Sequence, residues 1–218
     1  MKQGLRPVSE AGWPSRITVR VTAALLVLCL RVARSTWRIE PAGIRGIGAL
    51  LADGQPTIIA FWHGHMVPLL ALLQGHPAIV ISSSGFRGSV IGRMAQSFGH
   101  RSLQIDGAQG TRPLCMALQR REAPVALAVD GPVGPRHHAK PGAVFLSAIA
   151  QARILPVAAS ARPACALRRW DRLMMPLPFA TVSVRVGRQL LFAKPDLQHI
   201  DRATAVLSGS LTALCDAL

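Results

Sequence analysis

The segment Phe61-Trp62-His63-Gly64-His65 places an imidazole directly after a short apolar run that is typical of a buried strand. Histidine titrates near neutral pH, so His63 could act as a general base that takes the proton from a hydroxyl nucleophile. The same His-x-His pattern could instead be half of a metal site. No third ligand follows at a spacing familiar from metal sites, so we expect no metal.

A second segment suited to chemistry is the loop Asp130-Gly131-Pro132-Val133-Gly134-Pro135-Arg136. Gly131, Gly134 and the two prolines give the chain an irregular path that can bring backbone N–H groups and a guanidinium together. Arg136 can donate two hydrogen bonds to phosphate oxygens, and Lys140 adds positive charge nearby. The loop therefore predicts a phosphate site. A rigid surface turn with solvated arginines is the alternative interpretation.

Repeated β-α units position these segments. After Gly43, short β-branched runs alternate with helical stretches, which predicts a single α/β domain with a mostly parallel or mixed central sheet flanked by helices. Ligands of open α/β sheets lie beyond the carboxyl ends of the strands, so parallel strands would direct His63, Arg87, Asp106 and Asp130 into one cleft. The predicted strands are 57–62, 78–82, 102–105, 124–129, 154–160, 181–186 and 189–192, the last two forming a hairpin around Gly187; the predicted helices are 66–73, 88–98, 111–121, 142–152 and 201–217.

Composition indicates an anionic, apolar partner. The chain has 218 residues, enough for one domain with a substantial core, and half of them are apolar. It carries 25 Lys and Arg against 10 Asp and Glu, a net charge of +15 that favours phospholipid headgroups or nucleic acid. Tyrosine is absent and aromatic residues make up 5%, which is unlike a single-strand nucleic-acid binder, so we favour lipid. The four scattered cysteines are typical of reduced thiols.

The N-terminal region predicts contact with a membrane surface. Val21 to Leu30 is uncharged and lies between clusters of arginines. Ten residues are too few to cross a bilayer, so we expect an apolar, amphipathic helix at the interface. Residues 1–40 would form this membrane-associating segment, and 41–218 the α/β domain. An ordinary first helix packed on the domain is compatible with this; a secretory signal peptide is disfavoured, because no clean cleavage site follows Leu30.

Several blocks occur together in a recognisable order. They are Phe61-Trp62-His63-Gly64, Asp130-Gly131-Pro132 with Gly134-Pro135-Arg136, Lys140-Pro141-Gly142, Ile154-Leu155-Pro156-Val157, and Trp170-Asp171-Arg172 followed by Pro176-Leu177-Pro178-Phe179. In order and spacing the set resembles a short bacterial branch of the lysophospholipid acyltransferase-like family. The resemblance covers roughly residues 40 to 195.

This resemblance implies an acyltransferase that moves an acyl group from a coenzyme A or acyl carrier protein thioester to a hydroxyl of a lysophospholipid or related lipid. It implies no bound cofactor, no covalent enzyme intermediate and a peripheral position on the cytoplasmic face of the inner membrane, with acyl carrier protein as one partner. His63 matches the family's general base. Arg136, with Gly131, Gly134 and Lys140, matches the loop that holds the acceptor phosphate.

One block departs from the family pattern. Where the branch usually has Arg-Asp-Gly-Glu after the second strand, this chain reads Phe86-Arg87-Gly88-Ser89; where the branch has Arg-Gly-Ser after the third strand, it reads Asp106-Gly107-Ala108. We hypothesise that Asp106 and Arg87 have exchanged places, so that Asp106 orients His63 and Arg87 contacts substrate, with Asp130 as the reserve acid. Alternatively, the acid is lost and the protein is a weakened or inactive relative that binds anionic lipid.

Overall fold

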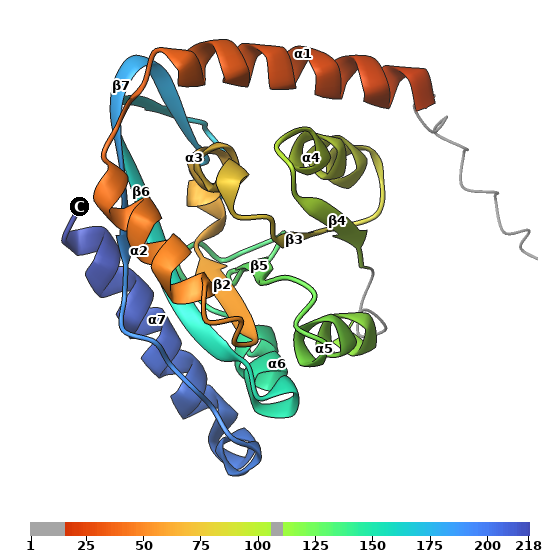
Figure 1. Cartoon of the computed structure of the whole chain (residues 1–218), viewed down its shortest axis with the longest axis vertical. Coiled ribbons are helices and arrows are strands. Elements are labelled where there is room, and N and C mark those ends of the chain that lie inside the picture. Colours follow the sequence, from red (N-terminus) through yellow and green to blue (C-terminus); the bar gives the residue numbers. More distant parts are fainter. Residues whose placement is uncertain (1–15, 106–110) are drawn as a thin grey trace, which may run out of the picture.

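In the computed structural model, which describes residues 16–105 and 111–218, a seven-stranded sheet forms the centre of the molecule (Figure 1). The order across the sheet is β1-β7-β6-β2-β5-β3-β4, and each neighbouring pair is parallel except β6 with β7. The predicted α/β domain with a mixed, mostly parallel sheet is therefore confirmed. The strands are β1 (Arg38–Ile39), β2 (Thr57–Phe61), β3 (Ile79–Ser82), β4 (Arg101–Gln104), β5 (Val125–Ala128), β6 (Arg153–Ala166) and β7 (Met174–Val186).

Helices cover both faces of the sheet (Figure 1). Strand β2 is buried along its whole length, and its successive side chains enter opposite cores, Ile59 and Phe61 on one face and Ile58 and Ala60 on the other. Such burial on both faces is typical of a central parallel strand. The helices are α1 (Arg16–Ser35), α2 (Pro41–Leu51), α3 (Met66–Leu72), α4 (Phe86–Ser97), α5 (Thr111–Gln119), α6 (Gly142–Ala150) and α7 (Ile200–Asp216), with short 3-10 turns η1 (His63–His65), η2 (Leu73–Gly75) and η4 (Lys194–His199).

The last predicted hairpin was wrong. Residues 189–192 form no strand, and Leu190 makes only an isolated bridge with Ile154. Instead β7 pairs antiparallel with β6, and both strands extend well beyond the predicted segments, to Ala166 and Met174. The extra residues of β6 are mostly exposed and include Pro163, so no alternation of apolar and polar residues marks them as a strand in the sequence. The other predicted strands and helices agree with the structure to within two residues at each end.

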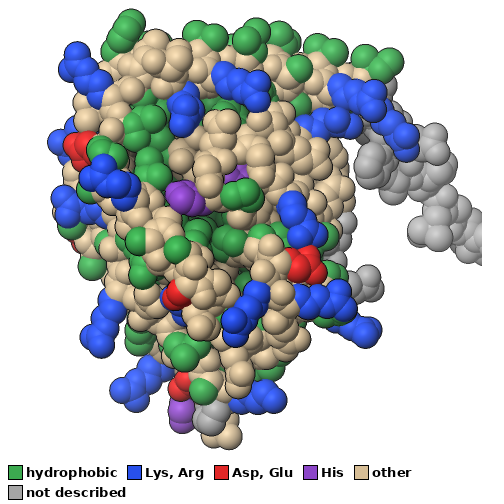
Figure 2. All heavy atoms as spheres, viewed as in Figure 1, with side chains coloured by type: hydrophobic (Ala, Val, Ile, Leu, Met, Phe, Trp, Pro, Cys, Tyr) green, Lys and Arg blue, Asp and Glu red, His purple; other side chains and the backbone are tan. Residues whose placement is uncertain are grey.

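Helix α1 contains the apolar stretch Val21 to Leu30 and lies along one edge of the domain (Figure 1). Its inner side packs on the domain through Val19, Ala23, Val27 and Leu30. Figure 2 shows a row of hydrophobic side chains along the outer edge of this helix. No helix within residues 16–105 and 111–218 is both long and apolar enough to cross a bilayer. The outer side of α1 includes Ile17, Val21, Leu25, Leu28 and Val32, each more than half exposed.

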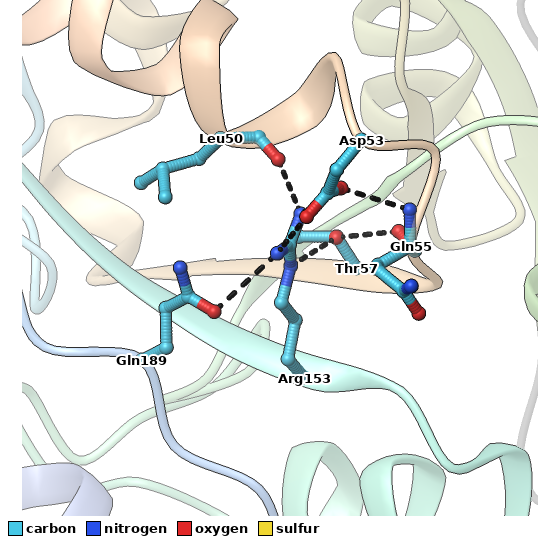
Figure 3. Close-up of polar contacts among 6 residues, drawn as sticks. All are labelled: Leu50, Asp53, Gln55, Thr57, Arg153 and Gln189. Carbon is cyan, nitrogen blue, oxygen red and sulfur yellow. Dashed lines mark hydrogen bonds and ion pairs between the residues drawn. The ribbon is translucent and has the colours of Figure 1, made fainter.

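Arg153 connects several elements at the edge of the sheet where β2 and β6 begin (Figure 3). Its guanidinium donates two hydrogen bonds of 2.7 Å to the carboxylate of Asp53. It also donates to the Thr57 hydroxyl at 2.9 Å and to the Leu50 carbonyl. The Arg153 hydrogen bond is the main reason that the pKa of Asp53 is lowered. One side chain thus joins α2, the start of β2 and the start of β6.

We expect Arg153→Met to lower the free energy of unfolding by about 2–3 kcal/mol, because several charge-assisted bonds are lost together. Urea unfolding followed by circular dichroism measures this loss. Arg188→Met, at an exposed position, is the matched control and should change the value by less than about 0.5 kcal/mol. Equal losses in the two variants would show that the bonds made by Arg153 contribute no net stability.

Candidate functional site

His63 stands at the carboxyl end of the central strand. β2 ends at Phe61, and η1 begins at His63, so the imidazole leaves the core at the edge of the sheet. The side chain is 17% exposed. The backbone N–H of His63 donates a 2.8 Å hydrogen bond to Oδ1 of Asp130. This bond joins the turn after β2 to the turn after the neighbouring strand β5.

Asp130 is completely buried directly behind His63. Burial raises the pKa of this carboxyl, while the hydrogen bond from the His63 backbone opposes the rise. Oδ2, the second carboxyl oxygen, has no hydrogen-bond partner among the described residues. A buried oxygen without a partner is uncommon in folded proteins and often marks a place of function. The reserve acid of the sequence analysis therefore touches the backbone of His63, with one oxygen still available.

A second buried carboxylate, that of Asp171, faces the imidazole itself. Asp171 lies in the connection between β6 and β7, and its Oδ2 is 3.9 Å from Nε2 of His63. The Leu173 N–H donates to its other oxygen at 3.3 Å, and Arg169 forms a 3.5 Å ion pair with Oδ2. No role was predicted for this residue from the sequence. Its only signal was its place in the Trp170-Asp171-Arg172 block.

Burial has the largest effect on the pKa of His63. It lowers the pKa of the imidazole, whereas the negative charges of Asp130 and Asp171 act in the opposite direction and Arg169 adds to the lowering. The neutral form therefore prevails at pH 7, as a general base requires. The Nδ1 atom of His63 is buried without a hydrogen-bond partner among the described residues. The ring can accept a proton, and carboxylates stand close enough to stabilise the cation.

Trp170 forms one wall of the site. Its ring is tilted against that of His63, with 5.5 Å between the centroids. Gly134 lies against the same indole, with φ at +71°, and a Cβ there would be 2.6 Å from Cε3 of Trp170. The second glycine of the predicted phosphate loop thus allows close packing on Trp170, and no larger residue fits.

The other predicted binding residues differ in how far they are exposed. Gly131 has φ at +69° and lies against the side chain of Lys140, which is partly exposed. Arg136 is exposed. Arg87 is exposed in the first turn of α4, after β3. Asp106, the predicted orienting acid, lies outside the described residues.

His65 belongs to the core. It is buried, and its Nδ1 accepts a 3.3 Å hydrogen bond from the Ala159 N–H. Burial lowers its pKa to about 4, so the ring is neutral at physiological pH. Within the described ranges, no three His, Cys, Asp or Glu side chains are grouped in a way that could hold a metal ion. The His-x-His pair thus divides into one residue at the site and one that is buried against β6.

Comparison with known proteins assigns no activity to this chain. No protein-family model matches the chain. An uncharacterised protein of Rickettsia prowazekii (strain Madrid E) is 25% identical over 143 residues, which span 62% of this chain and 64% of that protein. The match thus covers less than two thirds of the relative's length. Because the relative is uncharacterised, the similarity carries no activity over to this chain, and function has to be argued from the site.

The contact between η1 and the Asp171 connection can be tested with a glycine. A Cβ on Gly64 would lie 2.6 Å from the carbonyl oxygen of Asp171. We expect Gly64→Ala to push this connection away from His63 and to destabilise the fold by about 1–3 kcal/mol.

Gly46→Ala is the matched control, since a Cβ at this helical position meets nothing within 4 Å. It should be neutral or stabilising by up to about 1 kcal/mol. Thermal unfolding measures the stability of both variants. The NMR titration of His63 reports whether the Asp171 connection has moved away from the imidazole. A Gly64→Ala protein with unchanged stability and an unchanged His63 titration would contradict the close approach of Asp171.

Proposed function

We propose that this protein is an acyltransferase in which His63 activates the hydroxyl of a lysophospholipid or related lipid acceptor. The observation that carries the proposal is an imidazole at the carboxyl edge of the sheet with two buried carboxylates beside it. This arrangement suits a base that becomes charged only during the reaction. The family resemblance of the sequence blocks supplies the reaction class. The acyl donor would be acyl-coenzyme A or acyl carrier protein.

In the proposed reaction, His63 takes the proton of the acceptor hydroxyl as the oxygen attacks the thioester carbonyl. The new C–O bond forms, the C–S bond breaks, and the thiolate leaves with the proton that His63 returns. The imidazolium would be stabilised by Asp171, facing Nε2, and by the buried charge of Asp130. We therefore assign the orienting role proposed for Asp106 to Asp171. Asp130 would hold the backbone of His63.

The membrane is the proposed location of the acceptor. Support comes from the exposed apolar side of α1, in a chain that carries a net charge of +15. An apolar helix with arginines at its flanks suits the boundary between headgroups and acyl chains of an anionic bilayer. We accordingly propose a peripheral protein on the cytoplasmic face of the inner membrane. Arg136 and Lys140 remain the proposed ligands of the acceptor phosphate.

A second candidate function is lipid binding without turnover. Its support is the 3.9 Å separation of Nε2 from Asp171, whose Oδ2 already pairs with Arg169 at 3.5 Å. A working dyad needs a hydrogen bond here, which would require the carboxylate to approach the ring when substrate binds.

Activity decides between the two candidates. We expect the purified protein to transfer radiolabelled acyl groups from acyl-coenzyme A or acyl carrier protein to a panel of lysolipids. His63→Ala should lower kcat by about 10²–10⁴-fold, the usual contribution of a general base. Asp171→Asn should also lower it strongly, since the group that orients the base is neutralised.

Arg188→Gln, at an exposed position, serves as the control and should retain full activity. If the parent protein transfers no acyl group to any acceptor but still binds anionic vesicles, lipid binding without turnover is the correct reading. Full activity of Asp171→Asn would remove Asp171 from the mechanism.

The pH profile tests the charges around His63. Because the pKa of His63 is lowered from 6.5, the midpoint of the acidic limb of kcat/KM should lie below pH 6.5, with kcat/KM falling as the ring is protonated. Asp171 raises this pKa, so Asp171→Asn should move the acidic limb to lower pH. Arg169 lowers it, so Arg169→Gln should move the limb to higher pH. Shifts in the same direction for the two variants would be incompatible with this geometry.

A further inference from the structure

A pocket of about 320 Å³ lies between α1 and the start of α4, and three arginines line it. The described residues that form it include no acid. They are Arg16, Val19, Arg20, Gly85, Phe86, Ser89 and Arg93. In Figure 2, Lys and Arg side chains lie below the row of hydrophobic side chains that follows α1.

Each helix contributes a pair of residues one turn apart. Arg16 and Arg20 are four residues apart on α1, and Ser89 and Arg93 are four residues apart on α4. Side chains at this spacing lie on the same face of a helix, so both pairs can point into the pocket. Like charges at this spacing repel each other, and a third guanidinium across the pocket adds to the repulsion. An anion in the pocket would relieve this unfavourable arrangement.

The floor of the pocket holds the two helices at a defined separation. Val19, buried on α1, packs against Phe86 and Val90 of α4 in a small apolar cluster. Ser89 accepts a 3.1 Å hydrogen bond from the Gln104 side chain, which leaves its hydroxyl proton free to donate to a ligand. Guanidinium groups bind phosphate through paired hydrogen bonds, and a hydroxyl can complete the shell of donors.

From this arrangement we infer that the pocket between α1 and α4 binds a phosphomonoester. Three guanidinium groups are better suited to the two negative charges of a phosphomonoester than to the single charge of a phosphodiester. The apolar outer side of α1 belongs to the helix that forms one wall of the pocket. A phosphomonoester is presented to such a site both by a lipid headgroup in a bilayer and by a soluble phosphate ester. The inference does not depend on acyl transfer or on His63.

Flotation with vesicles tests the site on the full-length chain. Vesicles of phosphatidylcholine with phosphatidic acid present a monoester, and vesicles with phosphatidylserine present a diester. We expect Arg20→Gln/Arg93→Gln to weaken binding to the phosphatidic acid vesicles by at least about tenfold, the effect of losing one or two charged hydrogen bonds. The control Arg188→Gln/Arg202→Gln removes the same charge from exposed positions elsewhere and should have a small effect.

Calorimetric titration with inorganic phosphate and glycerol 3-phosphate identifies the source of the phosphate. Binding of these solutes that is lost in Arg20→Gln/Arg93→Gln supports the site with a soluble ester as its ligand. If Arg20→Gln/Arg93→Gln loses binding only to phosphatidic acid vesicles, and the soluble esters do not bind, the site is supported with a lipid headgroup as its ligand. Equal losses for the pocket and control variants, or no preference of the parent protein for a monoester in either assay, would overturn the inference. Circular dichroism confirms that both double variants are folded.

Discussion

The hydrogen bond from the His63 backbone to the buried carboxylate of Asp130 is the constraint on which the site depends. A completely buried carboxylate is costly unless it is paired or hydrogen-bonded, so the N–H of His63 must stay where Asp130 can accept from it. This requirement joins the turns after β2 and β5, which are neighbours in the sheet. The imidazole is thereby held at the edge of the sheet and partly enclosed.

The two edges of the sheet differ in how completely their polar groups are satisfied. At the amino ends of β2 and β6, Arg153 pairs with Asp53 and the surrounding oxygens, which makes this edge a stabilising one. At the carboxyl edge, several buried polar atoms have no hydrogen-bond partner among the described residues. An unpartnered buried group costs free energy, and proteins tolerate the cost where substrate supplies the missing partner. The atoms without a hydrogen bond are Nδ1 of His63, Oδ2 of Asp130, Oγ of Ser82 and Oδ2 of Asp171, the last of which forms an ion pair with Arg169.

Positive charge and apolar surface meet on the helix that precedes the sheet. Helix α1 uses one side to pack on the domain and exposes large apolar side chains on the other. Two of its arginines, Arg16 and Arg20, line the pocket shared with α4. A protein with these features can approach an anionic bilayer with the helix first, because desolvation of the apolar side and attraction of the arginines act in the same direction.

The sequence by itself determined the α/β class, most element boundaries, and the position of His63 at a strand end, because hydrophobic periodicity and the residues that follow each strand are local signals. It also identified Asp130 as an acid near the base. Only the tertiary structure decided that Asp171 faces the imidazole, since this residue is more than a hundred positions away in the chain and reaches the site through the long hairpin of β6 and β7. The outer half of that hairpin is rich in proline and apolar residues but lacks the alternation that is typical of a strand. Partners brought together by strand pairing leave no trace in local spacing.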